Sequence, residues 1–151
     1  MIVTPMEASH DTDELTRRVD ALRQAPLFAE LAEESLQRIA REMREVLIPA
    51  GSLLIEAGTK GSGMFVLEEG TVVVHRRGLD AIELGPGEVV GELALLLRDE
   101  ARTARVQAKT PVRCLALDRQ SFRQMMEAEP QLAIALLESA VEKLAELRPP
   151  P

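Results

Sequence analysis

The sequence predicts a mainly β fold, built from antiparallel strands and flanked by helices at both ends. Short apolar runs alternate with glycine-containing turns between Val46 and Gly87, at a spacing of about 8 to 12 residues that is typical of antiparallel sandwiches and barrels. Segments with helical periodicity precede and follow this region. Only 2% of the residues are aromatic but 46% are hydrophobic, so the core must be aliphatic.

Two helices are expected in residues 12–45, after a loose tail at residues 1–11. Asp11 and Glu14 form a capping-box pattern at the start of the first helix. The apolar residues that follow it at helical spacing are Leu15, Val19 and Leu22. The second helix begins near Glu33, and its apolar stripe is Leu36, Ile39, Ala40 and Met43.

The strands are expected in residues 46–118. The first five are the apolar runs at residues 46–48, 53–55, 64–67, 72–74 and 82–84. Residues 91–97 are too helical in composition for a strand. From Arg102 the chain alternates again, and Ala104, Val106 and Ala108 share one face. The apolar run at residues 112–117 is the last strand, and it contains the single cysteine, Cys114, which we interpret as a small buried hydrophobe.

Helices return in residues 119–147, before a short tail at residues 148–151. Asp118 caps the first, which carries Phe122, and Pro130 opens the second. The second helix has a heptad seam, widened by Ile134, Leu136 and Val141, and the seam itself is Ala133, Leu137, Ala140, Leu144 and Leu147. We expect one side of this helix to pack on the strands and the other to meet a second copy of the chain; the alternative is that the whole stripe packs within one chain.

The charge and the side-chain inventory exclude several classes of function. The net charge is −7, which disfavours DNA and anionic membranes as partners, and the pair Arg76-Arg77 is interpreted as a solvated turn. One cysteine allows neither an intramolecular disulfide nor a cysteine-based metal site. His10 lies in the tail and His75 on a hairpin, and no nucleophile is paired with a base, so we expect no enzyme, no metal and no prosthetic group. No signal peptide is visible, which predicts a cytoplasmic protein.

Arg102 is the first residue that points to a ligand. It shares strand parity with Ala104, and a guanidinium on a core face needs an anion. Two structural explanations remain open: Arg102 turns outward at the frayed end of the strand, or it pairs permanently with Glu92. Nearby, Gly91 permits close approach of backbone, and a helix beginning near Leu93 would present free N–H groups. A carboxylate such as Glu92 accepts hydroxyl hydrogens, so the combination suits a sugar phosphate.

These residues resemble a known motif. Gly91-Glu92-Leu93-Ala94-Leu95, followed after six residues by Arg102-Thr103-Ala104, is similar to the phosphate-binding cassette of cyclic nucleotide-binding domains of the catabolite activator and cAMP-dependent kinase type. The similarity covers residues 25–147, with the cassette at residues 90–104. It implies an antiparallel β-roll, a double-stranded β-helix of jelly-roll type.

The resemblance also assigns roles to residues. Glu92 would accept the ribose 2′-hydroxyl and Arg102 would pair with the cyclic phosphate. Main-chain N–H groups near Leu93, Ala94 and Thr103 would also bind the phosphate, and Gly91 would allow their close approach. Val90 stands where many members of that family carry an aromatic residue, and Ala101 stands where proline is common. Neither difference removes a contact to the ligand. The candidate base pocket is Val72, Val74 and Leu84, although core packing explains these three residues equally well.

The expected function is therefore a regulatory domain that senses a cyclic nucleotide. Thr103 after the arginine occurs in relatives that use either nucleotide, and we expect cAMP rather than cGMP. The alternative is a β-roll without ligand that serves in protein interaction or oligomerisation. Only four residues follow Leu147, so we expect no DNA-reading domain after the last helix. The signal would leave through self-association along that helix or through an unknown effector protein.

Overall fold

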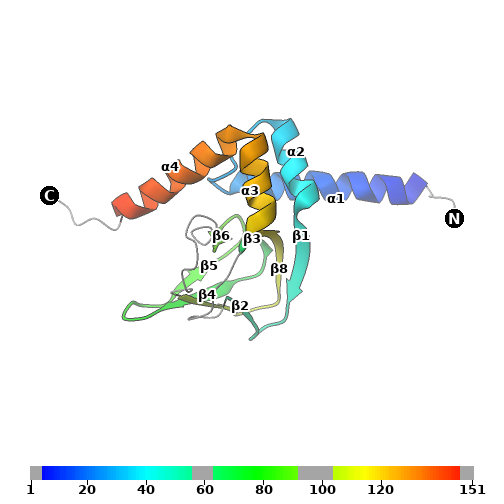
Figure 1. Ribbon diagram of the computed structural model, residues 1–151. Helices are drawn as coiled ribbons and strands as arrows, with labels where there is room; N and C mark the ends of the chain where they lie inside the picture. Colours follow the sequence, from blue (N-terminus) through cyan, green and yellow to red (C-terminus); the bar gives the residue numbers. More distant parts are fainter. Residues whose placement is uncertain (1–4, 56–62, 92–103, 147–151) are drawn as a thin grey trace.

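The computed structural model describes residues 5–55, 63–91 and 104–146, which form two antiparallel sheets and a group of helices (Figure 1). Within these residues one sheet has the strand order β1-β8-β3-β6 and the other the order β2-β7-β4-β5. The mainly β fold with flanking helices is confirmed. The elements are α1 Pro5–Gln24, α2 Glu33–Glu42, β1 Arg44–Ile48, β2 Leu53–Ile55, β3 Gly63–Glu69, β4 Val72–Arg76, β5 Ile82–Leu84, β6 Val89–Val90, β7 Ala104–Ala108, β8 Val112–Asp118, α3 Arg119–Ala128 and α4 Pro130–Glu146.

Each apolar run that predicted a strand lies in one, and the cap of α3 is also confirmed. The Asp118 carboxylate accepts a hydrogen bond from the Ser121 backbone N–H at 2.8 Å, which satisfies a donor that the helix leaves free. Strand β6 was not predicted, because two residues are too short to show an alternating pattern.

The predicted tail at residues 1–11 was wrong from Pro5 onward, because α1 already begins there. Proline is favoured at the first helical position, where its missing N–H would have no partner in any case. The residues after it, Met6, Glu7 and Ala8, are good helix formers. The capping-box pattern at Asp11 and Glu14 therefore lies inside the helix.

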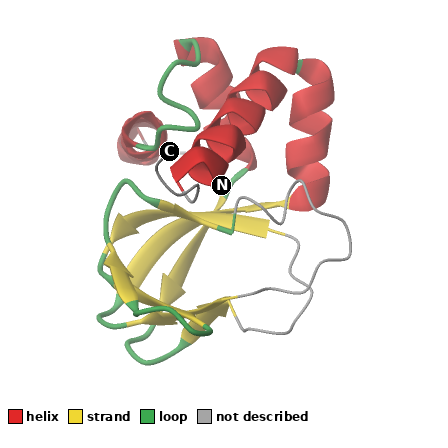
Figure 2. Ribbon diagram, turned by 90° about the vertical axis from the view of Figure 1, so that its left-hand side faces the viewer, coloured by secondary structure: helices red, strands yellow, loops and turns green. Residues whose placement is uncertain are grey.

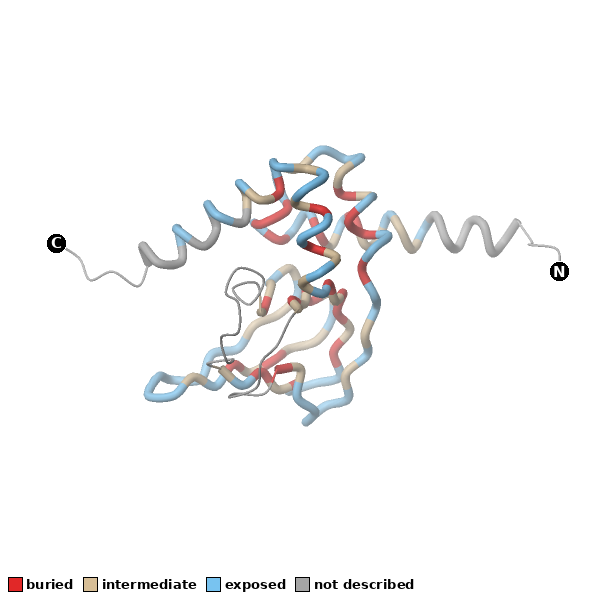
Figure 3. Tube along the Cα trace, in the orientation of Figure 1, coloured by how far each residue is buried: buried red, intermediate tan, exposed pale blue. Residues whose placement is uncertain are grey.

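The core has two parts because the sheet that contains β8 is covered on both faces (Figure 3). On β8, Leu115 and Leu117 pack against the helices, whereas Val112 and Cys114 pack against the other sheet. Figure 2 shows the helices gathered on one side of the strands. Among the described residues, no helix is both long and apolar enough to cross a membrane.

Candidate functional site

Strand β7 leads out of the cassette, and its faces are oriented as predicted. Val106 and Ala108 are buried and Ala104 is half-buried, whereas Arg105 and Lys109 are exposed. The face that Arg102 would continue by strand parity is therefore the core face. Arg102 lies outside the described residues, as do Glu92, Leu93, Ala94 and Thr103, so these site residues stay predictions.

The entry to the cassette is held by a tight turn and strand β6. The Gly87 N–H donates to the Leu67 carbonyl oxygen at 2.9 Å, and the Leu67 N–H donates to the Glu88 carbonyl oxygen at 2.9 Å. Val90 pairs with Phe65 on β3 and is 5% exposed, so the strand enters the core. Gly91 follows with φ +86°, a left-handed conformation that glycine adopts without strain. This geometry fixes the backbone that leads into the predicted cassette.

The three candidate base-pocket residues lie together on neighbouring strands. Val72 on β4 pairs in register with Leu84 on β5, and Val74 is the next residue on the same face of β4. Val72 is fully buried, Val74 is 7% exposed and Leu84 is half-buried against the same core. The structure brings the three side chains together, and their burial is also what core packing requires.

Arg76 is a candidate that the sequence interpretation missed. The prediction of a solvated turn holds for Arg77, which is exposed, but Arg76 is half-buried and shares the inward parity of Val72 and Val74. Its Nε atom is buried and has no hydrogen-bond partner among the residues that the structure describes, and its register partner on β7 is Ala104. A buried donor without an acceptor is costly, so Arg76, beside the end of the cassette, is a candidate to contact a bound molecule. Strand parity was the signal that could have identified it.

Two other buried polar groups have structural roles. Burial raises the pKa of the Cys114 thiol to about 11, and its Sγ lies 3.7 Å from the Val46 carbonyl oxygen, so this cysteine is an inert part of the core as predicted. The Glu68 side chain is 4% exposed, and its Oε2 lies 3.6 Å from Arg17 Nε and 3.5 Å from Arg113 Nε. This group ties α1 to β3 and β8.

The long helix α4 is anchored at its start and exposed beyond it (Figure 1). Leu132 is fully buried in the helical core. Ile134, Leu137 and Val141 are 49%, 59% and 55% exposed, which contradicts the alternative that the whole stripe packs within one chain. The side chains of Leu136, Ala140 and Leu144 and the position of Leu147 lie outside the description, so the heptad seam stays a prediction.

No cluster of ligands suited to a metal is found in the described part of the chain. No group of three or more histidine, cysteine, aspartate or glutamate side chains there could hold an ion. His75 is exposed on β4, as predicted for a solvated strand residue.

Comparison with known proteins gives a consistent result. The family model for the cyclic nucleotide-binding domain matches residues 45–129. A cyclic nucleotide-gated potassium channel of Mesorhizobium japonicum is 36% identical over 118 residues, which are 78% of this chain and 32% of the channel. The chain thus spans about a third of that relative.

Solved structures share the architecture. The N-terminal domain of a transcriptional regulator from Streptomyces coelicolor matches with a TM-score of 0.73 at 33% identity, covering 85% of this chain and 95% of that one. The Thermus thermophilus catabolite activator protein matches with a TM-score of 0.74 at 28% identity, covering 82% of this chain and 60% of that protein.

Proposed function

Because the chain belongs to the cyclic nucleotide-binding domain family, we propose that it is a sensor that binds one cyclic nucleotide between the end of β6 and the start of β7. One observation carries the proposal. The cassette sequence joins Gly91, whose backbone is left-handed at the end of a buried strand, to Ala104, which opens the inward face of β7. The cassette sequence thus connects β6 in one sheet with β7 in the other, and this connection between the sheets supports a ligand site there.

Within this proposal, Arg102 pairs with the cyclic phosphate and Glu92 accepts the ribose 2′-hydroxyl. Backbone N–H groups of Leu93, Ala94 and Thr103 complete the phosphate contacts, and Gly91 leaves room for them. The inward face of β7 supports the role of Arg102, because a guanidinium on that face needs an anion.

Calorimetric titration of the full chain with cAMP and cGMP tests the proposal. We expect micromolar binding, and Arg102→Ala and Glu92→Ala should each weaken it by about ten- to a hundredfold, since a hydrogen bond to a charged group contributes about 1.5–3 kcal/mol. Arg102→Ala should cost more, because it removes the partner of the ligand's only formal charge. No heat with either nucleotide at millimolar concentration would overturn the proposal.

We propose cAMP as the preferred ligand, since Val72, Val74 and Leu84 offer an adenine only apolar contact. A second candidate, cGMP, is favoured by Arg76, whose Nε has no partner in the described part of the chain, and by the hydroxyl of Thr103. Arginine is a natural donor to the O6 and N7 acceptors of guanine. The ratio of the two dissociation constants decides between them.

For the output, we propose self-association through α4 or docking on an effector protein. The stripe of Ile134, Leu137 and Val141 supports self-association, because three large apolar side chains lie exposed at helical spacing. Light scattering with and without cAMP tests this, and Leu137→Glu with Val141→Glu should leave only monomer. The alternative, an interaction module that binds no nucleotide, predicts self-association without any response to nucleotide in a thermal-shift assay.

A further inference from the structure

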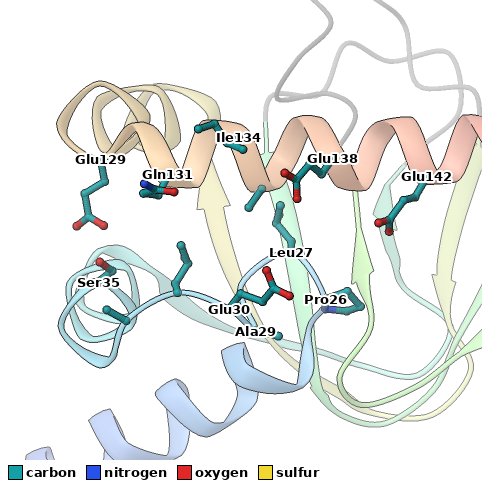
Figure 4. A pocket seen from close by; sticks show the side chains of 13 residues that line it. Pro26, Leu27, Ala29, Glu30, Ser35, Glu129, Gln131, Ile134, Glu138 and Glu142 are labelled. Carbon is teal, nitrogen blue, oxygen red and sulfur yellow. The ribbon is translucent and has the colours of Figure 1, made fainter.

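A groove outside the nucleotide site separates α4 from the connection between α1 and α2 (Figure 4). Its volume is about 520 Å³, which is large enough to take several side chains. Leu27, Leu31, Ile134 and Ala135 give it apolar walls. Residues 26–35 form one wall and the outward turns of α4 form the other.

The polar part of the groove is acidic. Glu30, Glu138 and Glu142 line it, and within the described part of the chain none of the three forms an ion pair. Glu129 also lines the groove, but it is paired with Arg38. Glu138 and Glu142 lie one helical turn apart on α4, where two like charges destabilise the helix slightly. A cation in the groove would relieve that repulsion.

The residues that line the groove exclude several classes of ligand. A cyclic nucleotide is disfavoured because its phosphate would face three carboxylates. A metal ion is disfavoured because these carboxylates are not among groups close enough to hold one. A second copy of the chain through the α4 stripe would use mainly Leu137 and Val141, which do not line the groove; only Ile134 belongs to both surfaces. The lining instead suits a ligand that is both apolar and basic.

We propose that this groove docks a basic amphipathic helix of a partner protein. The apolar face of the helix would lie on Leu31 and Ile134, and lysine or arginine side chains would meet Glu30, Glu138 and Glu142. The spacing agrees, since Glu138 and Glu142 are separated by about 6 Å along α4, the rise between positions i and i+4 of a partner helix. The proposal does not depend on nucleotide binding.

Fluorescence anisotropy with a labelled helical peptide of leucine and lysine, arranged with one apolar and one basic face, tests the proposal. At about 0.15 M salt we expect micromolar affinity for the full chain, weakened at least about tenfold by the Glu138→Lys/Glu142→Lys double variant. The matched control is Asp20→Lys/Glu42→Lys, which changes the net charge equally at exposed positions outside the groove and should weaken binding less than about threefold.

Three results would overturn the docking proposal. Equal loss in the two double variants, or equal affinity for a peptide of the same composition in an order without an apolar face, would mean unspecific charge attraction. A change of oligomeric state in Glu138→Lys/Glu142→Lys, without peptide binding to the parent chain, would assign the groove to a second copy. Glu138→Gln/Glu142→Gln is the milder variant if charge reversal impairs folding. Cyclic nucleotide is absent from the assay, so a failure here leaves the calorimetric test of the sensor unaffected.

Discussion

Gly70, in the turn between β3 and β4, is a position where a single methyl group should disturb the candidate site. Its φ is +90°, and a Cβ atom there would lie 2.2 Å from the Pro111 carbonyl oxygen. The turn is held against the β7–β8 connection, since the Thr71 N–H donates to Thr110 Oγ1 at 3.0 Å and the Lys109 N–H donates to the Thr71 carbonyl oxygen at 2.9 Å. Gly70→Ala should therefore push β4 away from its neighbours.

Gly78→Ala is the matched control for the size of this effect. Gly78 has φ +77°, but a Cβ atom there would meet nothing within 4 Å. The left-handed backbone alone costs a non-glycine residue about 1–2 kcal/mol, which is the loss expected for Gly78→Ala. Gly70→Ala adds an overpacking cost of about 1–3 kcal/mol against backbone that cannot rotate away, for a total of about 2–5 kcal/mol.

Urea and thermal unfolding of both variants measure the difference. Each kcal/mol shifts Tm by about 2–4 °C in a chain of this size, so Gly70→Ala should melt several degrees below Gly78→Ala. Because β4 carries Val72 and Val74, the folded fraction of Gly70→Ala should also bind cAMP more weakly. Equal destabilisation of the two variants would refute the steric argument.

Three further predictions concern single side chains. Asp118→Ala should lower the free energy of unfolding by about 1 kcal/mol at neutral pH, because it removes the cap of α3. The hydrogen bonds from Ser121 lower the pKa of Asp118, so this loss of stability should vanish as pH falls through the lowered pKa. A loss that stays constant in urea titrations down to pH 2 would contradict the prediction. Burial raises the pKa of Glu68 above its ordinary 4.5, although the nearby Arg17, Arg113 and Arg18 lower it, and Glu45 adds to the rise. The contribution of Glu68 to stability therefore falls as pH rises from 4.5 through the raised pKa. Glu68→Gln should flatten this part of the plot of stability against pH, and an unchanged plot would show that Glu68 does not cause the pH dependence. Arg76→Leu should weaken cGMP binding more than cAMP binding in calorimetry, and an unchanged ratio would remove Arg76 from the base pocket.

The elements of the fold were predictable because the signals are local. Glycines at the turns and alternating apolar residues placed β1 to β5, and the parity of Ala104 and Val106 gave the inward face of β7. Arg76 was missed because its neighbour Arg77 suggested a solvated turn, whereas its burial follows from the register of β4 with β7.

The acidic groove could not be predicted, because its two walls are far apart in the sequence. Pro26 and Leu27 belong to a connection, and Glu138 and Glu142 belong to α4, which in sequence is simply an amphipathic helix. Only the packing of Leu132 and Leu27 in one core brings the walls together. The cost of burying Glu68 likewise depends on three separate elements, α1, β3 and β8, which no local pattern connects.

Helix α4 lines the groove, and if it also carries the proposed output of the sensor, the two proposals are linked thermodynamically. Leu132 anchors the first turn of α4, whereas Leu137 and Val141 are exposed further along the helix. A shift of α4 on nucleotide binding would move Glu138 and Glu142 relative to Glu30, which lies on the opposite wall of the groove. The partner helix would then bind the two states with different affinity. Linkage is reciprocal: if bound nucleotide changes the affinity for the partner helix by some factor, the bound partner helix changes the affinity for nucleotide by the same factor.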